Sequence, residues 1–165
     1  TRRSSDLIEH YWYEKGKIKT ASIVSYGLKP LIKVDDVKST DSLYLIWPNS
    51  QKTKLKDKGY VDLELLEDYV GFCVEKIRDI MIAFKSELTN EQWSTYSHST
   101  PNGILTVTFI NGILNVLRLL VQNDKVSSVN NYRIQLKGIN SFDFKQYKSS
   151  QYRKMGEDVY KKYFE

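Results

Sequence analysis

Basic residues and tyrosines alternate near the end of the chain, in a pattern that suits contact with a phosphate backbone. The segment from Tyr147 to Tyr163 carries them around the expected start of a helix. Serine hydroxyls, N–H groups at a helix N-terminus and cationic side chains bind phosphate oxygens, and tyrosine rings stack on exposed bases. We therefore predict a site for DNA or RNA that consists of Lys148, Ser149, Ser150, Gln151, Tyr152, Arg153 and Lys154. The structural alternative is that the tyrosines pack on the core and the lysines between them face water.

A second basic run follows the turn at Pro48-Asn49-Ser50 and ends at Gly59. Its lysines fall on alternate residues, at Lys52, Lys54, Lys56 and Lys58. One interpretation is a mobile basic arm that contacts phosphates, and the other is a solvated loop. We include the four lysines in the predicted nucleic-acid site.

The sequence contains no catalytic motif. It has no Gly-rich phosphate loop, GxSxG, HExxH or CxxC pattern. Of the two histidines, His10 lies among aromatic residues of an expected helix, and His98 lies in a polar loop with no carboxylate near it in sequence. We predict no catalytic residue, no metal site and no cofactor. A nuclease that uses His98 is the enzymatic alternative.

Composition indicates an ordinary globular domain. The chain has 165 residues, 41% of them hydrophobic and 27% charged, and a net charge of +5, which permits an anionic partner without requiring one. The single cysteine, Cys73, cannot form an internal disulfide, which favours a cytoplasmic setting. No apolar run is long enough for a membrane span, and we expect neither a span nor a signal peptide. A chain that begins at Thr1 without methionine indicates a fragment or a processed piece of a longer protein.

The clearest structural signal is a long helix over residues 62–88. One apolar row at helical spacing consists of Leu65, Tyr69, Cys73, Ile77, Ile80, Phe84 and Leu88, and a second consists of Leu63, Leu66, Val70, Val74, Ile77 and Met81. Two adjacent rows are too wide for one neighbour, so we expect several elements to cover this helix. Asp62 is the predicted N-cap, and Gly71 is either a weak point or a place where another helix crosses closely.

A second long helix is expected over residues 101–122, with Pro101 at its first position. Its apolar residues Leu105, Phe109, Ile113, Val116, Leu117 and Leu120 share one face. The many β-branched residues make a strand the alternative, but Gly112 and the length of the segment argue against it.

Shorter helices are expected around these two. Their predicted caps are Ser4-Ser5-Asp6, Thr20, the Thr89–Gln92 capping box, Ser128, and Ser149 or Ser150. Residues 43–47 are too short for periodicity to decide between helix and strand. We predict a single all-α or mainly α domain, with a short β element near 43–47 as the open question.

Several short segments of the sequence resemble the C-terminal helical part of DGQHR-domain proteins, which are bacterial proteins akin to the regulator of DNA phosphorothioation. They are Thr1-Arg2-Arg3-Ser4-Ser5-Asp6-Leu7, Thr20-Ala21-Ser22-Ile23-Val24-Ser25, Trp93, Thr108-Phe109-Ile110-Asn111-Gly112 and Lys148-Ser149-Ser150-Gln151-Tyr152. The resemblance implies a context of DNA modification or phage defence. The Asp-Gly-Gln-His-Arg element itself is absent here, so no family activity carries over.

These observations lead to one main functional prediction and two alternatives. The main one is a non-enzymatic nucleic-acid-binding or accessory module of a bacterial DNA-modification or defence protein. The first alternative is a helical module that binds another protein or itself through an aromatic surface, made up of Tyr11, Trp12, Tyr13, Tyr44 and Trp47. The second is the nuclease described above.

Overall fold

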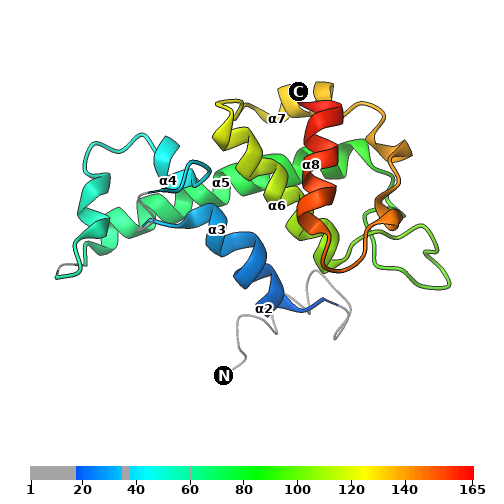
Figure 1. Cartoon of the computed structure of the whole chain (residues 1–165), viewed down its shortest axis with the longest axis horizontal. Coiled ribbons are helices and arrows are strands. Elements are labelled where there is room, and N and C mark those ends of the chain that lie inside the picture. The colour runs from blue at the N-terminus through cyan, green and yellow to red at the C-terminus, as the bar shows by residue number, and fades with distance from the viewer. Residues whose placement is uncertain (1–17, 35–37, 60) are drawn as a thin grey trace.

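The structure is a computed structural model that describes residues 18–34, 38–59 and 61–165 (Figure 1). The described residues are mainly helical and contain no strand, as predicted for a single helical domain. Residues 43–46 form a short helix, so the alternative of a β element there is wrong. The elements in chain order are α2 (Thr20–Ser22), the π-helix η1 (Ile23–Leu28), α3 (Lys29–Ile32), α4 (Leu43–Ile46), the 3-10 helix η2 (Lys52–Lys56), α5 (Leu63–Glu87), α6 (Val107–Gln122), α7 (Val129–Gln135), the 3-10 helices η3 (Ile139–Ser141) and η4 (Phe144–Gln146), and α8 (Tyr152–Tyr163).

Both long helices begin at a side-chain cap. The Asp62 carboxylate accepts the Leu65 N–H at 3.0 Å, as predicted. The second helix begins at Val107 and not at Pro101, because the Thr106 hydroxyl caps it by accepting the Phe109 N–H at 3.1 Å.

The segment before Thr106 bonds elsewhere and so stays outside the helix. The Ile104 N–H donates to the Gln92 carbonyl at 3.0 Å, and the Leu105 N–H donates to the Ser94 carbonyl at 3.1 Å. These two donors are held by the preceding loop, so the helix cannot extend back to Pro101.

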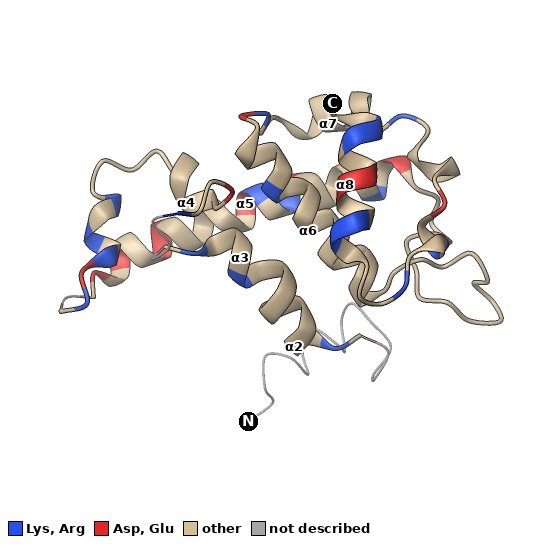
Figure 2. Ribbon diagram, in the orientation of Figure 1, with Lys and Arg blue, Asp and Glu red and all other residues tan. Residues whose placement is uncertain are grey.

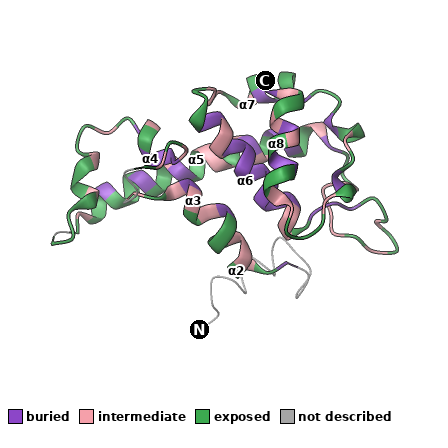
Figure 3. Cartoon of the chain, in the orientation of Figure 1, coloured by how far each residue is buried: buried purple, intermediate pink, exposed green. Residues whose placement is uncertain are grey.

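The α6 helix is the centre of the fold. It is buried over most of its length, whereas α5 buries one side (Figure 3). The elements η1, α3, α4, α5 and α8 all pack on α6. Its apolar face includes Ile113, Leu117 and Leu120, each 0% exposed. The sequence pattern singles out α5 as the central helix, but the helix with the most neighbours packed on it and the most buried residues is α6.

Two glycines let α8 approach α6 closely. A Cβ atom on Gly156 would lie 2.8 Å from the Gly112 carbonyl oxygen and 2.9 Å from the Asn115 Cβ. A Cβ atom on Gly112 would overlap the end of the Met155 side chain. The Asn115 Nδ2 donates to the Arg153 carbonyl at 3.3 Å across the same crossing. The two backbones therefore approach each other at Gly112 and Gly156, where neither helix has a Cβ atom.

Only the first of the two apolar rows on α5 belongs to the core. Leu65, Tyr69, Cys73, Ile80, Phe84 and Leu88 are buried as expected. In the second row, Leu63, Leu66, Val70 and Val74 are exposed, so the expectation that neighbours cover both rows is wrong. The reason is that the neighbours of α5 in the described chain, chiefly α7 and α6, pack on its first row and leave the second row open. Gly71 also meets nothing, since a Cβ there would have no atom within 4 Å in the described chain.

The aromatic residues around α4 are part of the core. Tyr44 and Trp47 are 5% and 3% exposed, and their rings lie 6.0 Å and 5.0 Å from the ring of Tyr69. The prediction that these two residues form an exposed interface is therefore wrong. The other members of that predicted surface, Tyr11, Trp12 and Tyr13, lie outside the described residues, as do His10 and the predicted Ser4-Ser5-Asp6 cap.

The remaining predicted caps have mixed outcomes. The Ser128 hydroxyl caps α7. The Thr89–Gln92 box closes as predicted, but it stabilises a turn and no helix follows it. Thr20 is the first residue of α2 and not its cap, and α8 begins at Tyr152 without the predicted serine cap.

Among the described residues, no helix combines the length and the apolar character that crossing a membrane requires.

Candidate nucleic-acid interface

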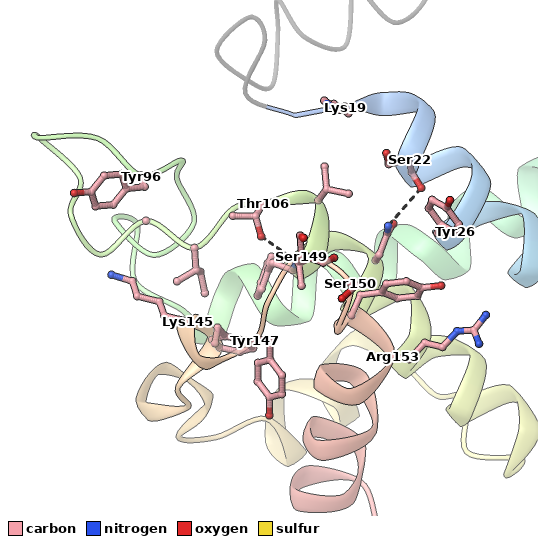
Figure 4. Close-up of a pocket in the computed structure, with 18 residues that line it drawn as sticks. Lys19, Ser22, Tyr26, Tyr96, Thr106, Lys145, Tyr147, Ser149, Ser150 and Arg153 are labelled. Carbon is pink, nitrogen blue, oxygen red and sulfur yellow. Dashed lines mark hydrogen bonds between the residues drawn. The ribbon is translucent and has the colours of Figure 1, made fainter.

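A cleft of about 1090 Å³ opens between the first helix and the segment that leads into α8 (Figure 4). Lys19, Ser22 and Tyr26 line it from one side, and the start of α6 contributes Thr106, Val107, Thr108, Phe109 and Asn111. Tyr96, Gly103 and Ile104 come from the loop before α6, and the opposite side consists of Phe144, Lys145, Tyr147, Ser149, Ser150, Tyr152 and Arg153. The cleft thus joins three stretches that are far apart in the sequence.

The charge of the described lining is entirely basic. Lys19, Lys145 and Arg153 line the cleft, and none of its described lining residues is an aspartate or a glutamate. The Lys145 Nζ donates to the Pro101 carbonyl at 2.7 Å, which holds this cation at the edge of the cleft. Positive charge in a concave surface without acidic neighbours attracts anionic ligands.

Tyrosine rings are the second feature of the cleft. Tyr26 and Tyr96 are 57% and 64% exposed. The ring of Tyr26 lies 6.3 Å from that of Tyr152, and the Arg153 guanidinium lies 5.8 Å from the same Tyr152 ring. The result is a solvent-facing aromatic surface with a cation at its edge.

Tyr147 differs from the other tyrosines, because its hydroxyl points away from the cleft (Figure 4). This hydroxyl donates to the Asp158 carboxylate at 2.7 Å. Burial, and then the negative charge of Asp158, raise the pKa of Tyr147 above its ordinary value. Tyr147 therefore anchors the segment that leads into α8.

The π-helix η1 positions Tyr26. The Ser22 carbonyl, at the start of this π-helix, accepts a hydrogen bond from the Asn111 Nδ2 at 3.4 Å, which ties η1 to α6. Asn111 is 2% exposed, and its Oδ1 is buried without a hydrogen-bond partner in the described part of the chain. A Cβ on Gly27 would lie 2.4 Å from that Oδ1, so a larger residue there would require the Asn111 side chain to move. Single π turns recur at functional sites. A buried acceptor without a hydrogen bond lowers the stability of the fold, and such groups are often found where a site serves a function.

The predicted C-terminal site is partly gathered in the cleft. Ser149, Ser150, Tyr152 and Arg153 line it, whereas Lys148, Gln151 and Lys154 do not. The Gln151 Oε1 instead accepts the Lys148 N–H at 2.8 Å, which closes the turn before α8. The Ser149 carbonyl accepts the Thr108 hydroxyl at 3.1 Å and ties this turn to α6.

The predicted lysine run lies away from the cleft, at the other end of the molecule from α8 (Figure 2). Lys52 to Lys56 form the 3-10 helix η2, which packs beside α4. The Lys52 Nζ donates to the carbonyls of Tyr44 and Leu45 at 3.2 and 3.0 Å, and the Lys56 Nζ lies 5.0 Å from the centre of the Tyr44 ring. Lys52 and Lys56 therefore support the α4 region, and the run does not converge with the C-terminal basic residues.

The residues considered for catalysis are not brought together. His98 is exposed in the loop before α6. The described residues contain no group of three or more histidine, cysteine, aspartate or glutamate side chains that could hold a metal ion. Cys73 is buried in α5, where desolvation raises the pKa of its thiol.

Four lysine and tyrosine residues of the lining lie outside the segments that the sequence pattern predicts to bind nucleic acid. They are Lys19, Tyr26, Tyr96 and Lys145. Each comes from a segment whose local pattern indicates only a helix or a loop, and they meet because η1 and the loop before α6 both pack at the N-terminal end of α6.

Comparison with protein-family models, curated proteins and solved structures finds no match to this chain.

Proposed function

We propose that this domain is a non-enzymatic module that binds single-stranded nucleic acid in the cleft between η1 and the N-terminus of α8. The observation that carries the proposal is that three basic side chains and exposed tyrosines share one cleft whose described lining has no acidic residue. Phosphate attraction and base stacking are the two interactions on which sequence-tolerant single-strand binding depends.

The two interactions have separate places in the cleft. Lys19, Arg153 and the hydroxyls of Ser149 and Ser150 supply contacts for phosphates. The rings of Tyr26 and Tyr152 offer a stacking surface, which is worth roughly 1–3 kcal/mol per base.

A single strand suits this geometry better than a duplex does. Stacking on Tyr26 requires a base whose face is exposed, and the bases of a duplex are already stacked on each other. The resemblance to DGQHR-domain proteins agrees with a DNA-modification or defence context in a bacterium, which stays a prediction.

The test is fluorescence anisotropy with a labelled DNA single strand of about 12 nucleotides, within the usual site sizes of ~4–16. The logarithm of affinity should fall linearly with the logarithm of salt concentration. The double change Lys19→Ala/Arg153→Ala should reduce that slope by about 1.4, since each lost phosphate contact contributes about 0.7 in a single strand. Tyr26→Ala should weaken binding about tenfold or more, with a smaller effect on the slope.

The matched control is Lys54→Ala/Lys58→Ala, which removes the same number of charges from the far end of the molecule. Its affinity should stay within about twofold of the unmodified chain. Binding that is absent at low salt, or that both double variants weaken equally, would show that the cleft is not the binding site.

A further inference from the structure

The second apolar row of α5 is a hydrophobic surface that nothing in the described chain covers. Leu63, Val70 and Val74 are 67%, 51% and 46% exposed, and Leu66 is 40% exposed. Half-buried Ile77 and Met81 continue the row. An apolar patch of this kind, rimmed by charged residues, often marks an interaction site.

The spacing of the row suits pairing along the whole helix. The positions 63, 66 and 70 repeat eleven residues later as 74, 77 and 81. An eleven-residue repeat is close to the natural period of an α-helix, so the row runs nearly straight along α5. A second straight helix can therefore follow it from end to end.

The charges beside the row identify the partner. Glu64 and Glu67 lie toward the start of the helix, and Arg78 and Lys85 lie toward its end. All four side chains are exposed, and none of them forms an ion pair within the described chain. The helix dipole accounts for charges in the first and last turns only, which leaves Glu67 and Arg78 unexplained by it.

A second copy of α5 in antiparallel orientation satisfies these charges. The midpoint between Glu64 and Lys85 and the midpoint between Glu67 and Arg78 both fall within two residues of Val74. A two-fold axis near Val74 would therefore bring each glutamate to a cation of the other copy, while a parallel pair would set like charges side by side. We propose that this row is the interface of an antiparallel homodimer.

The size of the row indicates a weak dimer. A helix of 25 residues is roughly 37 Å long, and a stripe about 10 Å wide along it covers about 370 Å² on each copy. The total of roughly 740 Å² lies below the ~1,200 Å² of stable interfaces. None of the residues in the row lines the cleft, so dimer formation does not depend on nucleic-acid binding.

Sedimentation velocity of the whole chain tests the proposal at concentrations from about 5 to about 500 µM, which span dissociation constants of a weak dimer. We expect a monomer that converts to a dimer, with a dissociation constant that Val70→Glu raises about tenfold or more because it buries an unpaired charge. The control Ile134→Glu places the same charge on an exposed apolar residue of α7 and should leave association unchanged.

Charge reversal tests the antiparallel register. Glu67→Lys and Arg78→Glu should each weaken the dimer about fivefold, and the double variant should restore it, because the two pairs are then exchanged. A chain that is monomeric throughout would overturn the proposal, as would a dimer that Val70→Glu leaves intact or a double variant without rescue. If the chain is monomeric and Val70→Glu lowers its melting temperature, the row is covered from within the chain and the proposal is wrong.

Discussion

Replacing Gly156 by alanine tests the central packing of the fold, the crossing of α6 and α8. The added Cβ would lie 2.7 Å from the Asn115 Nδ2, 2.8 Å from the Gly112 carbonyl oxygen and 2.9 Å from the Asn115 Cβ. Two of these three atoms are a backbone carbonyl and a Cβ, which cannot rotate away. The two helices must therefore move apart at their closest point.

The expected magnitude is the difference of two effects. Alanine is favoured over glycine inside a helix by about 1 kcal/mol. Overpacking costs about 1–3 kcal/mol, and the fixed contacts at this crossing place Gly156→Ala near about 3 kcal/mol. The net loss of unfolding free energy is then about 2 kcal/mol, which corresponds to a decrease in melting temperature of about 4–8 °C for a chain of this size.

The matched control is Gly71→Ala in the middle of α5. This glycine is also helical, but its added Cβ would meet no atom within 4 Å. Only the propensity gain remains, so the variant should be more stable than the unmodified chain by about 1 kcal/mol. Urea denaturation followed by circular dichroism, at about 5 µM to keep the proposed dimer dissociated, measures both values. If the two variants have the same stability, the close approach of α6 and α8 is wrong.

Two further predictions concern pH and an ion pair. Burial raises the pKa of Tyr69 and of Tyr132 above the ordinary value of 10.0. The unfolding free energy should therefore be constant near neutral pH and fall as the pH rises above about 10, because the unfolded chain then loses its tyrosine protons first. Urea midpoints measured from pH 7 to 11 check this prediction, and a flat profile would contradict it. Asp41→Asn should lower the unfolding free energy by about 1–3 kcal/mol, because the Arg118 Nη2 lies 2.6 Å from the Asp41 carboxylate and both side chains are largely buried. Glu87→Gln should lower it by under about 1 kcal/mol, because its pair with Arg133 is more exposed. Equal losses in urea denaturation would argue against a structural role for the Asp41 pair.

Features that depend on a few neighbouring residues could be predicted from the sequence. The Asp62 and Ser128 caps and the Thr89–Gln92 box each close between residues three apart, so their partners lie within one turn of chain. The helical class and the buried row of α5 follow from periodicity in the same way. Even here the loop before α6 took up the N–H groups of Ile104 and Leu105, and the expected helix start moved from Pro101 to Val107.

The candidate site likewise has one part that local sequence patterns predict and another part that they do not. Its C-terminal part, around Ser149 and Arg153, is a local pattern of basic residues, serines and tyrosines, and it could be found by its spacing alone. Tyr26 and Lys19 could not, since they enter the cleft only because η1 packs on α6 against Asn111. Lys52 and Lys56 show the reverse case, because the sequence pattern suggests a solvated or phosphate-binding run, whereas in the structure these two lysines contact the α4 region.

The sequence by itself determined the helical class, the two long helices, the caps at Asp62 and Ser128 and the basic, tyrosine-rich character of the chain, because those properties reside in residues one to four positions apart. Only the tertiary structure decided that α6 is the buried centre, that the second row of α5 is exposed and that three distant segments border one cleft. These outcomes depend on which faces of the helices meet, and a crossing such as that at Gly112 and Gly156 is chosen by the shapes of two surfaces that are far apart in the chain.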